Sequence, residues 1–322
     1  MQLLVKRAGF LTTVQDLGRF GHRASGVSAG GALDMHALRV ANLLVGNDEA
    51  AAGLELTLGV VRLQFESDRS IAWCGGPFDV RVGDDTITAG RLARVNAGEE
   101  LQLTSPPEGA RAWLAVSGGI DVPPVLGSRS TDLRSGFGGL DGRALRDGDR
   151  LSLGVEPPQV PRLTSRVAHS LAPNEWSNRR SRHPYLRIVR GAEWSQFGSN
   201  ALVNGTFTAS AESDRMGVRL EGPVLERTVN EDLLSEAIAP GTIQVPPSGQ
   251  PILLLGDCQT IGGYPKIAHV ITVDLGSAAQ LRPGDTVRFV ETSLREAEQL
   301  LAERERDLAR FRVGLELQMP WT

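Results

Sequence analysis

Two polar segments in the second half of the chain carry the residue types best suited to chemistry. The first, residues 212–221, contains Asp214 and Arg215, and the second, residues 257–268, ends in a Gly-Gly-Tyr-Pro-Lys run that includes Lys266. Both lie beside short strand-like runs. Burying polar groups without hydrogen-bond partners costs free energy. A strand that only packs in a core is therefore not expected to end in such a cluster of polar residues. The segments are therefore either two polar surface turns or parts of one binding site.

A third polar segment lies in the first half, in the glycine-rich run 127–139. It contains Ser128, Arg129 and Ser130. Glycines let a backbone approach a ligand closely, and arginines and hydroxyl groups bind phosphate or carboxylate. The run is therefore either an anion-binding loop or a plain solvent loop. Near the first strand, Asp16 and Arg19 form either a turn that holds the N-terminus or part of a cleft rim.

Several kinds of site are excluded by the sequence. It contains no Gly-x-x-x-x-Gly-Lys-Ser/Thr loop, which excludes a P-loop nucleotide site. The five histidines have no zinc-finger spacing, and the two cysteines, Cys74 and Cys258, lie far apart. Only two of the 34 basic residues are lysines, Lys6 and Lys266. Neither lies in a Met-Lys-Met context, so we expect no biotin on this chain.

The composition narrows the class of protein. A length of 322 residues suggests two domains, and 41% hydrophobic residues are enough to build full cores. A net charge of −4 without a basic stripe gives no support to nucleic-acid binding. No apolar run approaches the length of a membrane helix, and the N-terminus reads as a first strand rather than a signal peptide. Two distant cysteines favour a reducing, cytoplasmic location.

Strand signals dominate the chain. Short β-branched runs recur between Gly, Pro and Asp turns, which is typical of a β-sandwich or β-barrel. The predicted strands include residues 60–65, 70–73, 78–82, 86–88, 112–116, 186–189, 242–245, 252–255, 269–273 and 286–290. Residues 82–86 predict a hairpin turn.

Two helices are predicted among these strands. Asp34 caps a helix that runs through Val45, and a Ser-Leu-Arg-Glu capping box at Ser293 begins a second helix that reaches about Arg312. Residues 154–184 are rich in proline and have little periodicity, which indicates an extended linker. The order of glutamate, glycine and two strands in residues 55–75 recurs in residues 236–256, which suggests a duplicated β-domain.

Six motifs occur in an order that closely resembles the biotin-dependent carboxyltransferase-like family. Members are called allophanate hydrolase subunit 2, the 5-oxoprolinase C subunit or sporulation-kinase-inhibitor antagonist. The resemblance covers about residues 1–292. Its motifs are Thr-Val-Gln-Asp-Leu-Gly-Arg (13–19), Gly-Ala-Leu-Asp (31–34), Ala-Asn-Leu-Leu-Val-Gly-Asn (41–47), the run 118–132, Ser-Asp-Arg-Met-Gly (213–217) and Gly-Gly-Tyr-Pro-Lys (262–266).

The resemblance implies a mainly β fold of two cyclophilin-like β-barrel domains, with a few short helices and a C-terminal helix. We place the first domain at residues 1–155, a Pro-rich linker at 156–184, the second domain at 185–291, and the C-terminal helix and tail at 292–322.

The function implied by the resemblance is that of one component of an ATP-dependent 5-oxoprolinase, which hydrolyses 5-oxo-L-proline to L-glutamate. Such a component works with a smaller partner of related fold, of the allophanate hydrolase subunit 1 or 5-oxoprolinase B-subunit type, and with a lactam-utilisation subunit. ATP, with Mg²⁺, is then used by the complex, and this chain is expected to be inactive alone. Two alternatives remain: a regulatory protein that sequesters a kinase-inhibitor partner, and a carboxyltransferase component that uses carboxybiotin, as in urea amidolyase.

Opening a lactam through a phosphorylated amide requires cations around phosphate and a base for water. The predicted charge stabilisers are Arg129, Arg215 and Lys266, and Asp214 is either the base or the residue that orients Arg215. The predicted catalytic set is thus Asp214, Arg215 and Lys266. The predicted substrate- and phosphate-binding set is Ser128, Arg129, Ser130, Gln259, Thr260, Gly263 and Tyr264, and we expect both sets to line one inter-domain cleft.

Overall fold

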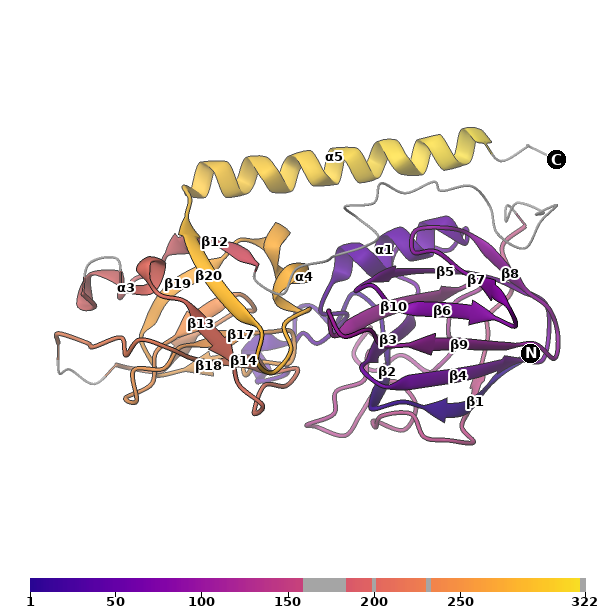
Figure 1. Cartoon of the computed structure of the whole chain (residues 1–322), viewed down its shortest axis with the longest axis horizontal. Coiled ribbons are helices and arrows are strands. Elements are labelled where there is room, and N and C mark those ends of the chain that lie inside the picture. The colour runs from indigo at the N-terminus through magenta and orange to yellow at the C-terminus, as the bar shows by residue number, and fades with distance from the viewer. Residues whose placement is uncertain (159–183, 199–200, 230–232, 319–322) are drawn as a thin grey trace. The chain divides into compact units, whose positions relative to one another are not determined.

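The computed structural model describes residues 1–158, 184–198, 201–229 and 233–318, which form two compact units. The first unit contains residues 1–19, 30–158 and 307–318, and the second contains residues 20–29, the described part of 184–229, and 233–306. Figure 1 labels the elements of both, and each unit is described by itself.

The described strands of the first unit form two sheets. The order in the larger sheet is β11-β1-β4-β9-β6-β7, and in the smaller sheet it is β2-β3-β10-β5-β8. The strands are β1 (Gln2–Ala8), β2 (Leu11–Gln15), β3 (Gly53–Thr57), β4 (Val60–Phe65), β5 (Arg69–Gly75), β6 (Asp79–Val82), β7 (Asp85–Thr86), β8 (Ala93–Val95), β9 (Glu100–Thr104), β10 (Arg111–Val116) and β11 (Arg150–Ser152).

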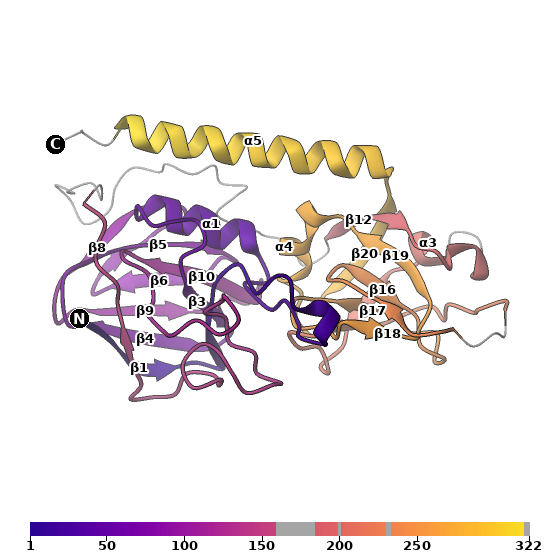
Figure 2. The same cartoon turned by 180° about the vertical axis from the view of Figure 1, so that it is seen from behind.

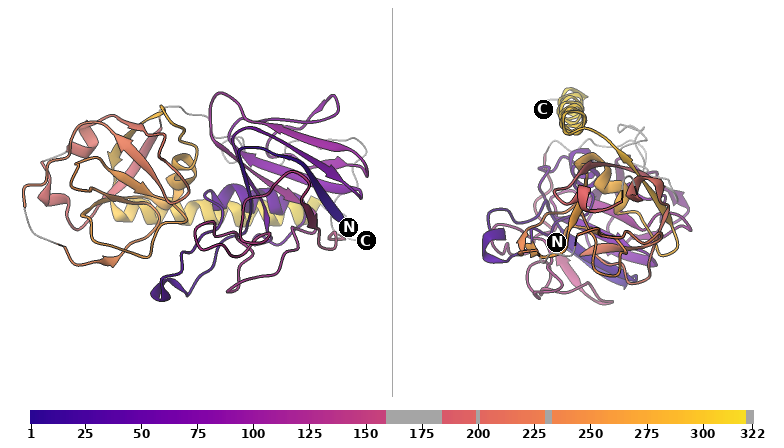
Figure 3. Two further views of the ribbon diagram at one scale, coloured as in Figure 1. Left: turned by 90° about the horizontal axis from the view of Figure 1, so that it is seen from below. Right: turned by 90° about the vertical axis from the view of Figure 1, so that its left-hand side faces the viewer.

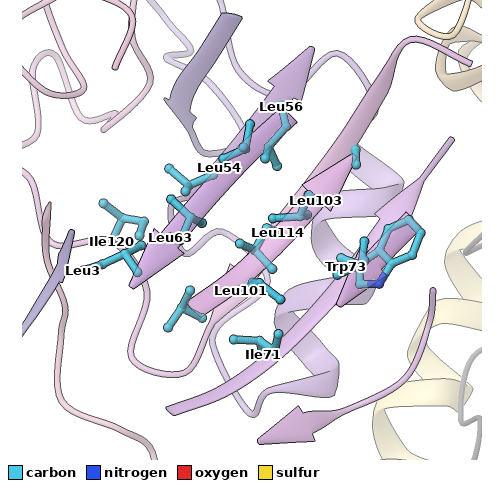
Figure 4. Packing of buried hydrophobic residues seen from close by; sticks show 14 of the residues in the cluster. Leu3, Leu54, Leu56, Leu63, Ile71, Trp73, Leu101, Leu103, Leu114 and Ile120 are labelled. Atoms are coloured by element: carbon cyan, nitrogen blue, oxygen red, sulfur yellow. The ribbon is translucent and has the colours of Figure 1, made fainter. Parts of the chain in front are cut away.

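The core of the first unit lies between these sheets. Strand β4 alternates buried and accessible positions, as a strand with one covered face must, whereas every residue of β5 and β10 is buried. The difference arises because helix α1 (Met35–Leu44) packs on β5 and β10 (Figure 1). Figure 4 shows Leu54 and Leu114 of the smaller sheet gathered with Leu63 and Leu101 of the larger one.

The second unit contains a closed barrel with the strand order β12-β19-β16-β17-β14-β13-β20, and a separate ribbon of β15 and β18. Its strands are β12 (Tyr185–Arg190), β13 (Phe207–Ala209), β14 (Gly217–Glu221), β15 (Glu236–Ala237), β16 (Thr242–Gln244), β17 (Ile252–Leu254), β18 (Ile261–Gly262), β19 (Lys266–Val270) and β20 (Thr286–Glu291). Its short helices are η1 (Arg23–Ser25), η2 (Trp194–Gln196), α3 (Ala201–Asn204), η3 (Thr272–Asp274) and α4 (Leu275–Ala278). The predicted mainly β fold is confirmed.

Both predicted helices are confirmed, with adjusted ends. The Asp34 side chain accepts a hydrogen bond from the Ala37 amide at 3.0 Å, which caps α1 as predicted. Helix α5 spans Leu294–Gln318, beyond the predicted end, and is unbroken (Figure 3). Ser293 Oγ accepts from the Glu296 amide at 3.1 Å, but the Glu296 carboxylate accepts from Thr292 Oγ1, so half of the predicted capping box forms.

Most of the predicted strands are confirmed to within a few residues. Strands β6 and β7 pair Val82 with Asp85, which is the predicted hairpin. The predicted strand at 269–273 is wrong in its second half, because β19 ends at Val270 and a 3₁₀ turn, η3, follows. The Asp274 carboxylate causes this turn, since it accepts the Arg187 amide at 2.8 Å and its guanidinium at 2.6 Å.

The two units differ from the predicted domain boundaries. Residues 20–29 belong to the second unit, where the Arg23 guanidinium donates to the Ile238 carbonyl, and Figure 2 shows this indigo segment beside the orange strands. The last part of α5, from Asp307, belongs to the first unit. Of the predicted linker, residues 159–183 lie outside the described residues. Glu156 belongs to the first unit and accepts from Ser117 Oγ at 2.7 Å.

The sequence correspondence between the two halves does not extend to strand pairing. Strands β16 and β17 pair with each other, whereas β4 and β5 lie in different sheets of the first unit. Strands with similar sequences therefore pair with different neighbouring strands in the two units.

Candidate functional site

Asp214 ends a turn that leads into β14. Its Oδ1 accepts hydrogen bonds from the backbone amides of Met216 at 2.7 Å and Gly217 at 3.2 Å. This is the local turn geometry that Asp favours. It occupies Oδ1 and leaves Oδ2 available to a ligand or water.

Arg215 and Asp257 form a buried ion pair directly behind this turn. Arg215 Nε lies 2.8 Å from Asp257 Oδ2, and Arg215 NH2 lies 3.0 Å from Oδ1. The Asp257 amide also donates to the Arg215 carbonyl at 3.1 Å. The two motif segments that stood out in the sequence are therefore joined by side chains and backbone. In this arrangement Arg215 binds the protein's own carboxylate.

A hollow of about 200 Å³ lies over this pair of segments. It brings together three of the predicted residues, Asp214, Gln259 and Tyr264. Gln244, from β16, adds a buried amide whose Nε2 donates to the Tyr264 carbonyl at 3.3 Å. The remaining lining residues are Glu212, Met216, Gly217, Arg219, Ile252 and Leu254. The walls thus combine carboxylates, amides and a phenol, which can bind a small polar molecule.

A second, larger hollow of about 770 Å³ shares Tyr264 with the first and includes the predicted Gly263. Apolar side chains line part of it, among them Phe197, Val245, Pro246 and Pro265, but polar groups make up slightly more of its accessible lining. Thr260 lines neither hollow. It is buried, and its carbonyl accepts from the Ile238 amide at 3.1 Å. Its role is therefore to fix the chain between Asp257 and β18.

Lys266 begins β19 and contacts two carboxylates. Its Nζ forms an ion pair with Glu236 and lies 3.9 Å from Glu193 Oε2. Its backbone amide donates to Glu193 Oε2 at 2.7 Å. On the same strand, the His269 ring faces Thr242 Oγ1 at 3.2 Å. Partial burial lowers the pKa of His269, the Lys266 ammonium lowers it further, and Glu193 opposes the shift.

The predicted residues of the first half lie in the first unit and are held by Asp16. Its Oδ1 accepts from Ser128 Oγ at 2.6 Å and Ser130 Oγ at 2.5 Å. Its Oδ2 accepts from the Arg129 amide at 2.6 Å. This explains the polar turn noted at Asp16 in the sequence: it closes the glycine-rich loop onto the first strands.

The Arg129 side chain extends beyond the loop. Its Nε donates to the Val122 carbonyl at 2.9 Å, and its NH2 lies 3.7 Å from Asp121. The anion-binding roles of Ser128, Arg129 and Ser130, and the cleft that they were expected to share with Lys266, stay predictions.

The three predicted charge stabilisers have carboxylate partners within the chain, and their role toward a ligand stays a prediction. Arg215, Lys266 and Arg129 each lie beside a carboxylate of the chain itself. Within the described ranges, no cluster of three or more His, Cys, Asp or Glu residues could hold a metal ion. Nor does any helix in the described part of the chain have the length and apolar character to cross a membrane.

Residues 26–30 match a hydrolase sequence motif but do not have the local structure that this motif requires. Residues 26–30 read Gly-Val-Ser-Ala-Gly, the Gly-x-Ser-x-Gly pattern of α/β hydrolases. The catalytic form of this pattern needs a sharp strand-to-helix turn. Here the run follows η1 and no strand leads into it, so Ser28 is not placed as such a nucleophile.

Two glutamates that contact Lys266 were not among the predicted site residues. Glu193 and Glu236 contact Lys266 from 73 and 30 residues away. Neither belongs to the motifs that flank Lys266. Glu193 follows β12, which pairs with β19, and Glu236 lies in β15, which pairs with β18, so only the tertiary fold brings them to Lys266.

Comparisons with known proteins show the family to which the chain belongs. A family model described as carboxyltransferase domain, subdomain A and B, matches residues 25–291. The chain is 46% identical over 298 residues to the C subunit of 5-oxoprolinase from Escherichia coli, covering 92% of this chain and 93% of that protein. It is 40% identical over 296 residues to the Haemophilus influenzae protein of the same name, covering 91% and 92%. Kluyveromyces lactis urea carboxylase has a similar structure (TM-score 0.88, 29% identity), over 96% of this chain but only 29% of that enzyme.

Proposed function

The chain belongs to the carboxyltransferase-domain family, and from this premise we propose that it is the C subunit of an ATP-dependent 5-oxoprolinase. The complex hydrolyses 5-oxo-L-proline to L-glutamate. The observation that supports this most is the similarity to 5-oxoprolinase C subunits across nearly the full length of both chains.

The smaller hollow has chemistry that suits a lactam. The amides of Gln244 and Gln259 can each donate and accept a hydrogen bond, which matches the N–H and C=O of the 5-oxoproline ring. In this proposal Asp214, which lines the same hollow, orients or deprotonates a water. Arg215 supports this arrangement by holding the two motif segments together through Asp257.

The activity is divided among several chains in this proposal. The partners are a smaller subunit of related fold and a lactam-utilisation subunit, and this chain alone is inactive. ATP and Mg²⁺ act at the level of the complex, and this chain carries no biotin. Its two cysteines, Cys74 and Cys258, are both buried and form no disulfide, which supports a reducing, cytoplasmic location.

Reconstitution tests the proposal. The chain is purified alone, with the smaller subunit, and with both partners, and ATP-dependent glutamate formation from 5-oxoproline is measured. We expect activity only in the full set. Activity of the chain alone contradicts the division of labour, and inactivity of the full set contradicts the function.

A second candidate is a carboxyltransferase component that uses carboxybiotin, favoured by the similarity to urea carboxylase over 96% of this chain. It is tested by supplying a carboxybiotinylated carrier protein and following transfer of labelled carbon dioxide to urea or to 5-oxoproline. Transfer in the absence of the lactam-utilisation subunit supports this second function.

A further inference from the structure

The Lys266 ammonium lies between two carboxylates that differ in accessibility. Glu236 contacts Lys266 Nζ directly, and 63% of its side chain is exposed. Glu193 lies on the other side, with Oε2 at 3.9 Å and only 11% of its side chain exposed. The Lys266 side chain is itself 11% exposed.

Glu193 is fixed in this position. Its Oε2 accepts the Lys266 amide at 2.7 Å, and its own amide donates to the Lys266 carbonyl at 3.4 Å. Gly191 presses against the same carbonyl so closely that a Cβ at that position would overlap it. Glu193 cannot leave without breaking the start of β19.

Glu236, in contrast, lies in a short and exposed element with few constraints on its position. It lies in the two-residue strand β15, which among the described strands pairs only with β18, through Glu236–Gly262 and Ala237–Ile261. Both residues of β15 are exposed. Because most of its side chain is exposed, the Glu236 carboxylate is well solvated when it leaves Lys266, and the ion pair itself contributes little net free energy on the Glu236 side. Another anion can therefore replace the Glu236 carboxylate at small cost.

We propose that Lys266 anchors an anionic oxygen group of the ligand, and that Glu236 occupies this position until the ligand displaces it. The exchange is one carboxylate for another, so the charge around the ammonium is unchanged while Glu193 keeps Lys266 in place. The inference rests on the proposed function, because 5-oxoproline carries one carboxylate. The shared chemistry is that of a carboxylate or a phosphate oxygen.

Because the chain contains only two lysines, the environment of Lys266 can be followed directly by NMR. Chain labelled with ¹³C at the lysine side chain gives two lysine ε-methylene signals, from Lys6 and Lys266, and a Lys6→Arg variant assigns them. Spectra are recorded with the labelled chain alone and in the reconstituted complex. The probes are 5-oxoproline, its neutral carboxamide, ATP and inorganic phosphate.

We expect 5-oxoproline to shift the Lys266 signal and to leave the Lys6 signal unchanged, and its carboxamide to shift neither. A shift with ATP or phosphate alone assigns the position to a phosphate instead of the substrate carboxylate. If none of the anions moves the Lys266 signal in either sample, the proposal is wrong. This readout does not depend on turnover, so it is separate from failure of the 5-oxoprolinase function.

Kinetics of the active complex give a second test. Glu236→Ala removes the competing carboxylate, so the KM for 5-oxoproline should fall by about two- to five-fold, the range expected for an exposed ion pair. The matched control is Glu291→Ala, which removes an exposed glutamate of the same unit paired with Arg190, and it should leave the KM unchanged. If Glu236→Ala instead lowers kcat by a hundredfold at constant KM, Glu236 takes part in the chemistry and is not a placeholder.

Discussion

Arg215 and Asp257 form a two-pronged ion pair at 2.8 and 3.0 Å, with 4% and 6% of their side chains exposed. A buried pair of this kind contributes less to net stability than its geometry suggests, because both charges have lost their water. Removing only one partner is strongly destabilising, because the other charge stays buried without its counter-ion.

Arg215→Ala should therefore lower the free energy of unfolding by about 3–5 kcal/mol, because the buried Asp257 carboxylate loses this guanidinium. Urea unfolding of the purified chain measures the change. Replacing both residues by apolar ones, Arg215→Met with Asp257→Leu, should recover most of the loss. The control is Arg219→Ala, whose side chain is 54% exposed and pairs with Glu212 at 3.6 Å. A stable Arg215→Ala variant without activity would instead place this guanidinium in direct contact with substrate.

Asp16 is the acceptor on which the glycine-rich loop closes, and its loss should affect the loop first. Asp16→Ala leaves the hydroxyls of Ser128 and Ser130 and the Arg129 amide without their acceptor, at a cost of roughly 2–4 kcal/mol. Faster proteolysis within residues 123–139 and a lower unfolding midpoint would report it. Asp84→Ala, at an exposed turn between β6 and β7, should change stability by less than about 0.5 kcal/mol. Equal effects of the two substitutions would contradict the role of Asp16.

Local features of the fold could be predicted from the sequence. The Asp34 cap and the β6–β7 turn depend on residues within three or four positions of each other, so the pattern contains the whole cause. The same holds for the turn at Asp214, where the side chain binds amides two and three residues further on.

The rest depends on pairings that no local pattern encodes. The sequence marked Asp16 and the Ser128–Ser130 run separately, but their hydrogen bonds connect positions more than 110 residues apart. Residues 269–273 look like one strand because Ile271 and Val273 are β-branched, yet Arg187 and Asp274 bend the chain after Val270. Likewise Lys266 was marked by its motif, whereas its carboxylates come from other elements.

The close approach of Gly191 to β19 gives a prediction about Lys266 itself. Gly191→Ala puts a methyl group against the Lys266 carbonyl, which must shift the backbone there. We expect a loss of about 1–3 kcal/mol in stability and a lower kcat/KM in the complex. Gly198→Ala is the matched control, because a Cβ at Gly198 meets no atom within 4 Å. If both variants behave like the wild type, Glu193 and Gly191 do not hold Lys266 in place.

His269 provides a pH readout of the same cluster. Partial burial and then the Lys266 ammonium lower the pKa of His269. Lys266→Met should therefore raise that pKa toward its ordinary value of about 6.5, without reaching it, because burial remains. The control Lys6→Met removes the other lysine, which lies in the first unit, and should leave the titration of His269 unchanged. NMR titration of the imidazole measures both.

The same shift fixes how His269 contributes to stability as the pH changes. When the pKa of a histidine is lower in the folded state than in the unfolded state, the unfolded chain binds the proton at a higher pH than the folded chain does. Its contribution is present above pH 6.5 and is lost as the pH falls from about 6.5 through the folded-state pKa. In His269→Gln this contribution is absent, so the free energy of unfolding should vary less between pH 5 and pH 7 than in the wild type. A steeper dependence in the variant would mean that folding favours the protonated imidazole, and Glu193 would then outweigh both burial and Lys266 at this position.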